Sequence, residues 1–257
     1  RQMCIRDRLS TIFIIFMTVS LLLIMYSLRP YYVITMTTIP SRIFKIEKIL
    51  NSLQKQLFPP NYIILNIPEK YNRFDDTIEE MPSFITTNPK IIVNRVKTDY
   101  GPATKMLGIL EDDNLPIDKD TIVLVADDDV VHRPLWAYKL LFNIVTNPRS
   151  VSSIFNANHH SNPIVFGNGG WGFYMDILNT DDIMEHFERF KDDCIFVDDD
   201  FFTNYFNNKK IPILRAGTPV LYGEDIKVLK VDNALHKIKG ENSRAKSRKS
   251  CNTSMKS

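Results

Sequence analysis

The chain has 257 residues, of which 44% are hydrophobic and 24% are charged, a composition typical of one globular domain with an added segment. Its 32 basic and 30 acidic side chains give a net charge of +2, which argues against a nucleic-acid-binding protein. Three widely spaced cysteines, Cys4, Cys194 and Cys251, form no CxxC pair and no zinc pattern. A disulfide between Cys194 and Cys251 and a pair of free thiols are both open.

Residues 9–28, with the sequence LSTIFIIFMTVSLLLIMYSL, are uncharged and apolar on every face of a helix. At about 1.5 Å per residue they span a hydrocarbon core of roughly 30 Å. A cleaved signal peptide is the alternative, but such peptides have apolar cores of about 7–15 residues and a small-residue cleavage site. This segment is longer and has no such site, so we expect a single-pass membrane anchor.

Arg1, Arg6 and Arg8 precede this segment and Arg29 follows it, which favours a cytoplasmic N-terminus. In a eukaryotic host the protein is then a type II membrane protein whose main domain is lumenal, as in the Golgi or the endoplasmic reticulum. Residues 1–8, RQMCIRDR, resemble a translated sequencing adaptor, so these arginines indicate an orientation only where they are native.

Beyond this segment, runs rich in β-branched residues alternate with runs of helical period. The predicted strands are residues 31–36, 62–67, 91–96 and 121–126, and the predicted helices are residues 43–56, 104–111 and 135–145. Ser41 is the expected N-cap of the first helix, and residues 71–89 show no clear period. The alternation predicts one α/β domain over residues 30–236, with a mostly parallel sheet between helices. Residues 237–257 are polar and basic, and we expect them to be disordered.

Asp127, Asp128 and Asp129 directly follow the apolar run of residues 121–126. Three carboxylates this close repel one another, and a divalent cation removes that repulsion. Mg²⁺ typically takes one or two carboxylates together with substrate phosphates, so a nucleotide diphosphate is the expected third component. Ligands of parallel sheets bind at the carboxyl ends of strands, where this triplet falls. A solvated loop with an aspartate at a helix N-cap is the alternative.

The segment VLVADDDVVHRP resembles the strand and DXD motif of GT-A glycosyltransferases. This resemblance implies a GT-A type, Rossmann-like α/β/α sandwich, a Mn²⁺ or Mg²⁺ ion and a nucleotide-sugar donor. It implies that Asp129 is a metal ligand, that Asp127 faces the metal or the donor ribose, and that Asp128 belongs to the donor site. The family often takes a further ligand from a C-terminal histidine, here His236, although a lone histidine is more often structural.

Two segments before the triplet also follow the order of the family. VITMTTIPSR resembles the strand and loop that hold the nucleotide base, with Thr37, Thr38 and Arg42 as contacts. DYGPATK resembles the segment in which Asp99 meets the base or ribose and Lys105 meets a phosphate. A weak surface ion pair between Asp99 and Lys105 is the alternative.

A second acidic cluster, VDDDFF at residues 197–202, resembles the element that supplies the catalytic base of inverting members. The resemblance makes Asp200 the base and Asp199 its neighbour. Asp198 is also acidic, so the alignment of this segment with the family element can be shifted by one residue. A helix N-terminus, where the helix dipole favours acidic side chains, is the alternative.

Between the two acidic clusters lies GNGGWGFY, residues 167–174, which resembles the glycine-rich donor and acceptor loop of the family. Gly169 and Gly170 are the positions where backbone can approach a ligand closely, and Trp171 offers a flat face to a sugar. A tight turn between two strands is the alternative.

These segments together predict a metal-dependent, hexosyltransferase-like enzyme that moves a sugar from a nucleotide diphosphate to a hydroxyl of a glycan, protein or lipid. Inversion follows if Asp200 is the base. Another metal-dependent nucleotide enzyme, a nucleotidyltransferase or phosphohydrolase, is one alternative, although no P-loop is present. A non-catalytic domain that binds nucleotide sugars is the other.

Overall fold

The computed structural model describes residues 8, 10–20, 29–154, 164–216, 226–228 and 244–255. The chain divides into two compact units, Arg1–Pro30 and Tyr31–Ser257. In the first unit residues 10–20 are helical, and no helix within the described residues is both long enough and apolar enough to cross a membrane. The span predicted at residues 9–28 includes residues 21–28, which lie outside the described part, so the anchor stays a prediction.

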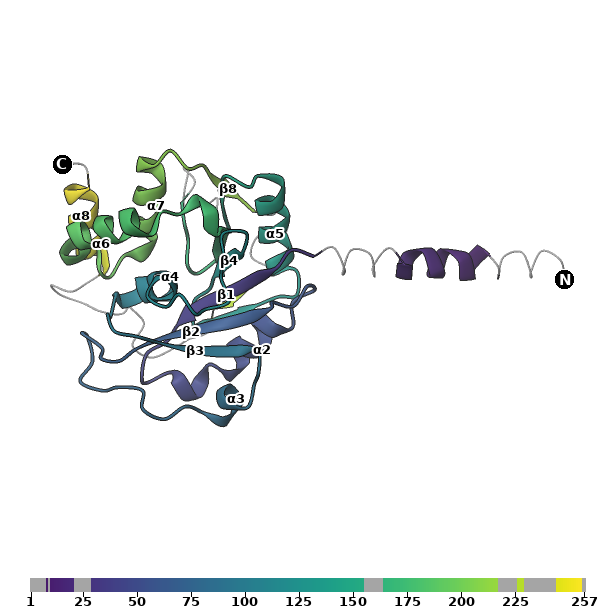
Figure 1. The fold of residues 1–257 in the computed structure, drawn as a ribbon, viewed down its shortest axis with the longest axis horizontal. Helices are drawn as coiled ribbons and strands as arrows, with labels where there is room; N and C mark the ends of the chain where they lie inside the picture. Colours follow the sequence, from purple (N-terminus) through teal and green to yellow (C-terminus); the bar gives the residue numbers. More distant parts are fainter. Residues whose placement is uncertain are drawn as a thin grey trace. The chain divides into compact units, whose positions relative to one another are not determined.

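A sheet of seven strands forms the centre of the second unit in the described part of the chain (Figure 1). In spatial order its strands are β3 (Ile91–Val96), β2 (Tyr62–Pro68), β1 (Tyr32–Thr37), β4 (Ile122–Val125), β7 (Trp171–Tyr174), β6 (Val151–Ser153) and β8 (Ile213–Arg215). β7 runs antiparallel to β4 and β6, whereas every other neighbouring pair is parallel. The mostly parallel sheet predicted from the alternation of elements is confirmed.

Successive residues of the central strands enter two different cores. On β1, Tyr32, Ile34 and Met36 belong to one core and Val33 to the other. The first core is closed by α2 (Glu47–Gln54), α3 (Ser83–Thr86) and α5 (Trp136–Thr146), and the second by α4 (Thr104–Leu107), α6 (Thr180–Cys194) and α7 (Asp198–Asn208). Figure 1 shows α2 and α3 on the side of the sheet opposite α4. Helices therefore cover both faces, which gives a Rossmann-like α/β/α arrangement.

Short elements complete the described part of this unit. β5 (Val130–His132) pairs antiparallel with β9 (Ile226–Val228) and directly follows the aspartate triplet. The 3₁₀ turns are η1 (Ile43–Lys45), η2 (Gly101–Ala103), η3 (Gly108–Leu110) and η4 (Met175–Ile177).

Two predicted helices differ in the structure. The first begins as η1 and becomes α2, whose N-cap is Ile46 without a side-chain hydrogen bond, so the prediction of Ser41 as N-cap is wrong. The second is divided into α4 and η3, and the carbonyl of Gly108 accepts a hydrogen bond from Asn94 Nδ2 at 2.9 Å. That contact ties the carbonyl to β3, and its remaining hydrogen bond, from the N–H of Glu111 at 3.4 Å, is of the 3₁₀ type.

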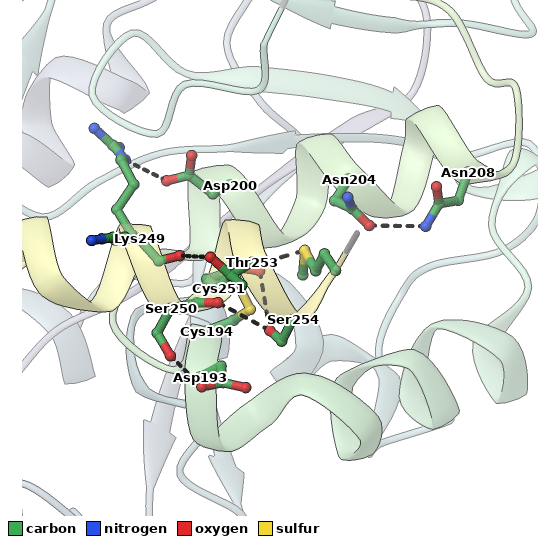
Figure 2. The surroundings of a disulfide bond; sticks show 12 residues. Asp193, Cys194, Asp200, Asn204, Asn208, Lys249, Ser250, Cys251, Thr253 and Ser254 are labelled. Carbon is green, nitrogen blue, oxygen red and sulfur yellow. Dashed lines mark hydrogen bonds and ion pairs between the residues drawn. A yellow bond between two sulfur atoms is a disulfide. The ribbon is translucent and has the colours of Figure 1, made fainter. Parts of the chain in front are cut away.

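Cys194, the last residue of α6, forms a disulfide with Cys251 in α8 (Arg244–Ser254), as Figure 2 shows. Of the two states left open by the sequence, the structure therefore has the disulfide. α8 lies against α6 and α7, and Cys251 is buried. The prediction of disorder is wrong for residues 244–254, because a buried cross-link holds this polar helix against the domain. Residues 237–243 lie outside the described residues.

Candidate active site

β1 and β4 are adjacent and parallel, so the segments that follow them meet at one edge of the sheet. All four residues of β4 are aliphatic and buried, which fixes the strand in the centre of the fold. Ala126, the next residue, donates its N–H to the carbonyl of Thr35 at 3.0 Å. The aspartate triplet therefore emerges beside the loop that begins after Thr37.

The carboxylate of Asp128 joins these two loops. It accepts hydrogen bonds from Thr38 Oγ1 at 2.7 Å and from Arg42 Nη1 at 2.5 Å. Burial raises the pKa of Asp128, while Arg42 and Thr38 act in the opposite direction. The three residues were expected to contact the donor, but the structure shows these groups bound to one another. Thr37, expected beside them, donates its hydroxyl to the carbonyl of Asn66 on β2 at 2.8 Å.

Lys105 connects the aspartate triplet to the second acidic cluster. Its Nζ atom lies 2.5 Å from Asp127 Oδ1 and 2.6 Å from Asp198 Oδ2, and the residue is 3% exposed. Burial opposes the charge of Lys105, but the attraction of Asp127, Asp198 and Asp199 outweighs it and raises the pKa of the ammonium group. A phosphate contact was expected here. The structure instead gives Lys105 two carboxylate partners, so it holds the two clusters together.

The glycine-rich turn closes over this lysine. Gly167 donates its N–H to Asp199 Oδ1 at 2.8 Å. A Cβ atom at position 167 would lie 2.6 Å from Lys105 Nζ and 2.9 Å from Asp127 Oδ1, so any larger residue there would have to displace this ion pair. Asp199, expected beside the catalytic base, is buried and positions this turn.

The other two glycines of the turn are required by packing. A Cβ atom at Gly169 would lie 1.7 Å from the carbonyl oxygen of Ile154. Gly170 has φ +83°, and a Cβ atom there would lie 2.4 Å from the ring of Trp136. Trp136 Nε1 also donates to the carbonyl of Gly169 at 2.7 Å. Both glycines thus serve the contact between this turn and α5, and their expected role at the donor stays a prediction.

Trp171 does not face the site. Its side chain is fully buried, and its ring stacks on Phe173 with centroids 5.6 Å apart. Phe202 and Phe206 of α7 complete an aromatic cluster around it. The expectation that this indole packs on a sugar is therefore wrong for the structure described, because β7 begins at Trp171 and turns the ring into the core.

The second acidic cluster forms the first turn of α7, as the alternative based on the helix dipole predicted. Asp198 and Asp199 point toward Lys105 and Gly167, whereas Asp200 Oδ2 lies 2.7 Å from Arg248 Nε of α8 (Figure 2). Residues two apart on a helix project about 200° from each other, so Asp200 faces away from Asp198. The expected base is thus directed toward α8.

Asp99, expected at the base or ribose, is hydrogen-bonded to its own turn and to the segment after β2. Its carboxylate accepts hydrogen bonds from the N–H of Asn72 at 2.7 Å and from the N–H of Gly101 at 2.9 Å. It therefore fixes the approach of the chain to η2 and, through that turn, the position of Lys105.

Asp129 is the member of the triplet whose carboxylate has no hydrogen bond or ion pair among the described residues. Burial, followed by the charges of Asp127 and Asp128, raises the pKa of Asp129 to about 7, although Arg42 and Lys105 oppose this. A half-buried, unpaired carboxylate beside two others fits a divalent cation, which removes the repulsion between them.

The described ranges contain no group of three or more His, Cys, Asp or Glu residues arranged to hold a metal. Asp127 and Asp129 are thus two candidate ligands that need a third. His236, the expected third ligand, lies outside the described residues.

Two residues that form ion pairs at this site, Asp198 and Arg248, were not predicted from the sequence. Asp198 was noted only as a register alternative, and Arg248 lay in a segment expected to be disordered. The run of three aspartates at residues 198–200 is the sequence signal for Asp198, because carboxylates this close require a cationic partner. Cys251, three residues after Arg248, is a signal for the second, because pairing with Cys194 brings α8 to α7.

No family model matches the chain, and no curated protein matches it. Solved structures that match include the crystal structure of residues 1–349 of TarS from S. aureus, with 19% sequence identity and a TM-score of 0.35. The match covers 48% of this chain and 35% of that one, so the chain spans about a third of that structure. A likeness at this level supports no statement about function.

Proposed function

We propose that this protein is a metal-dependent glycosyltransferase that takes a sugar from a nucleotide diphosphate. The observation that carries the proposal is the carboxylate of Asp129, which is half-buried and raised in pKa and has no partner among the described residues. Such a group is stabilised by a hard cation, and a cation at two carboxylates retains positions for diphosphate oxygens. The resemblance of the triplet to a DXD motif supports the further proposal that the diphosphate belongs to a nucleotide sugar.

The residues that would hold a Mn²⁺ or Mg²⁺ ion are Asp127 and Asp129, with His236 as the third ligand. The ion, when bound, neutralises negative charge on the diphosphate leaving group. Lys105 holds Asp127 in place, because the ion pair fixes one oxygen of that carboxylate. Asp128 orders the loop after β1 through its hydrogen bonds with Thr38 and Arg42.

Asp200 is the proposed general base for the acceptor hydroxyl, which gives inversion at the anomeric carbon. Its carboxylate points toward α8 and away from Asp198, so this role requires the first turn of α7 to reorient when donor and acceptor bind. Asp198 is 5% exposed and paired with Lys105, and Asp199 is buried, whereas the Asp200 side chain is 21% exposed. Arg248 is 43% exposed, and ion pairs this exposed contribute at most about 1 kcal/mol. An acceptor can therefore displace Arg248 from the carboxylate. The acceptor class is a glycan, protein or lipid hydroxyl.

We also propose that residues 9–28 anchor the protein in a membrane with the main unit on the lumenal side. The uncharged sequence of this segment and the arginines before it support this arrangement.

The test is product analysis with the full chain, a panel of nucleotide sugars and Mn²⁺. We expect release of a nucleoside diphosphate that stops when a chelator removes the metal. Asp129→Asn should lower turnover at least about 100-fold, because a lost metal ligand removes charge stabilisation in the transition state. Asp113→Asn, at an exposed aspartate before β4, is the matched control. Release of pyrophosphate or inorganic phosphate would instead indicate a nucleotidyltransferase or a phosphohydrolase.

The base is tested separately. Asp200→Asn should lower turnover at least about 100-fold while metal-dependent binding of the donor, measured by calorimetry, stays unchanged. Asp192→Asn, at an exposed position of α6, serves as control. Normal turnover in Asp200→Asn removes Asp200 as base, and absence of any metal-dependent nucleotide binding in the unmodified chain favours a protein without this activity.

A further inference from the structure

α5 presents an apolar stripe to solvent. Leu135, Phe142 and Val145 are 44%, 61% and 48% exposed. Their spacing places them on one face of the helix, opposite the residues that α5 buries in the core. Tyr138 lies between them, with its ring centroid 6.2 Å from that of Phe142. Large apolar side chains grouped in this way mark an interaction surface.

The stripe continues onto the loop that precedes β2. Phe58 lies 6.0 Å from the ring of Tyr138, and Leu57, half exposed, donates its N–H to the carbonyl of Pro134 at 2.7 Å. We call this surface the α5 patch, which consists of Leu57, Phe58, Leu135, Tyr138, Phe142 and Val145.

Basic residues flank the segments that form the α5 patch. Arg133 and Arg149 are exposed at the two ends of α5, and Lys55 is exposed beside Leu57. The sequence has no aspartate or glutamate between Asp129 and Asp176, so α5 and its flanks carry positive charge only. An apolar face with a basic rim is the pattern of a surface that lies on anionic lipid.

The position of the α5 patch in the fold agrees with this pattern. Tyr32 donates its hydroxyl to the carbonyl of Phe58, so the patch adjoins the first residues of β1. The chain enters β1 directly after the unit Arg1–Pro30, which contains the apolar segment of residues 9–28. Tyr31, at this entry, is 42% exposed.

We propose that the α5 patch docks on an anionic lipid surface. A second copy of the chain fits less well, because a symmetric dimer through this patch would place Arg133 and Arg149 of one copy against the same basic rim of the other. Lipid headgroups with negative charge complement this rim, and acyl chains take up the apolar side chains. The inference does not depend on the glycosyltransferase proposal.

The experiment uses tryptophan as a depth probe in the full chain, bound to vesicles of phosphatidylcholine and phosphatidylglycerol with brominated acyl chains. Phe142→Trp reports on the patch, and Phe44→Trp is the matched control, because both phenylalanines are 61% exposed. Phe44 precedes α2 and Leu57 follows it, so the length of α2 separates the control from the patch. The native Trp136 and Trp171 are fully buried and give a constant background.

We expect bromine to lower the added fluorescence of Phe142→Trp about twofold and to leave that of Phe44→Trp unchanged. Omission of phosphatidylglycerol, or the double substitution Arg133→Gln and Arg149→Gln, should weaken the quenching. Equal quenching at both positions, or none at Phe142→Trp, overturns the proposal. So does a dimer in sedimentation experiments that Phe142→Asp converts to a monomer, since a second copy then occupies the patch.

Discussion

The Nζ atom of Lys105 lies 2.6 Å from Oδ2 of Asp198, and this ion pair joins the segment after β3 to the first turn of α7. The same ammonium group binds Asp127, so one buried cation holds two carboxylates from different parts of the chain.

Substitution of Lys105 by methionine should therefore be strongly destabilising. Removing one partner of a buried ion pair leaves charge uncompensated and costs about 3–5 kcal/mol. Urea unfolding measures this change, and Lys119→Met, at an exposed lysine before β4, should change stability by less than about 0.5 kcal/mol. If Asp198→Asn in the Lys105→Met background restores none of the loss, the two residues are not coupled as the structure indicates.

His132 should make stability depend on pH. Burial lowers the pKa of His132 from 6.5 to about 3, so the folded protein keeps this imidazole neutral. Between these values the unfolded chain binds a proton that the folded chain does not, and the free energy of unfolding therefore falls as pH falls, by up to roughly 5 kcal/mol. His132→Phe keeps a ring beside Trp136, whose centroid lies 4.2 Å away, and should flatten this dependence. Urea unfolding of both proteins at about pH 7 and pH 4.5 makes the comparison; identical slopes would falsify the assignment.

The disulfide between Cys194 and Cys251 should stabilise the fold. The two residues are separated by 57 positions, and a loop of this length predicts roughly 4 kcal/mol from the entropy of the unfolded chain. Cys251→Ser should lower the free energy of unfolding by a few kcal/mol, and a reductant should have no further effect on that variant. Peptide mapping without reductant should find Cys194 linked to Cys251, and a linkage of either residue to Cys4 contradicts the structure.

Trp171 should behave as a core residue. Trp171→Ala removes a fully buried ring and should cost about 3–5 kcal/mol of stability. Trp171→Phe keeps most of the packing against Phe173 and should leave the affinity for a nucleotide sugar unchanged. A rise in the dissociation constant of the donor in Trp171→Phe, with stability kept, would show that the indole contacts the sugar after all.

Local pattern was sufficient for the first four strands of the fold, β1 to β4, whereas β5 to β9, each of three or four residues, were not predicted. β3 begins and ends where its β-branched run predicts. β4 lies within the predicted range, because a fully buried strand needs an unbroken apolar sequence. The helices were harder. The segment from Thr104 was expected as one helix, but hydrogen bonds to neighbouring strands divide it into short turns, and such tertiary contacts leave no periodic signal.

In the candidate site, too, some features were predictable from the sequence and others depend on tertiary packing. Asp128, Arg42 and Lys105 were selected by residue type and position, and the structure places all three at one edge of the sheet. Their partners were not foreseen, because the attraction between Lys105 and Asp198 depends on how α7 packs and not on neighbouring residues in the chain. Trp171 was misplaced for a related reason: a tryptophan after glycines suits a binding loop and the start of a buried strand equally well.

The disulfide closes a covalent ring from Cys194 to Cys251 that contains the whole of α7 and its acidic cluster. A protease that cuts the chain anywhere inside this ring does not release a fragment, since both pieces stay joined through sulfur. The domain nicked in this way migrates as one species on a gel without reductant and as two with it. Products of limited proteolysis therefore have to be compared on gels with and without reductant. On a gel without reductant alone, a chain cleaved within the ring looks intact.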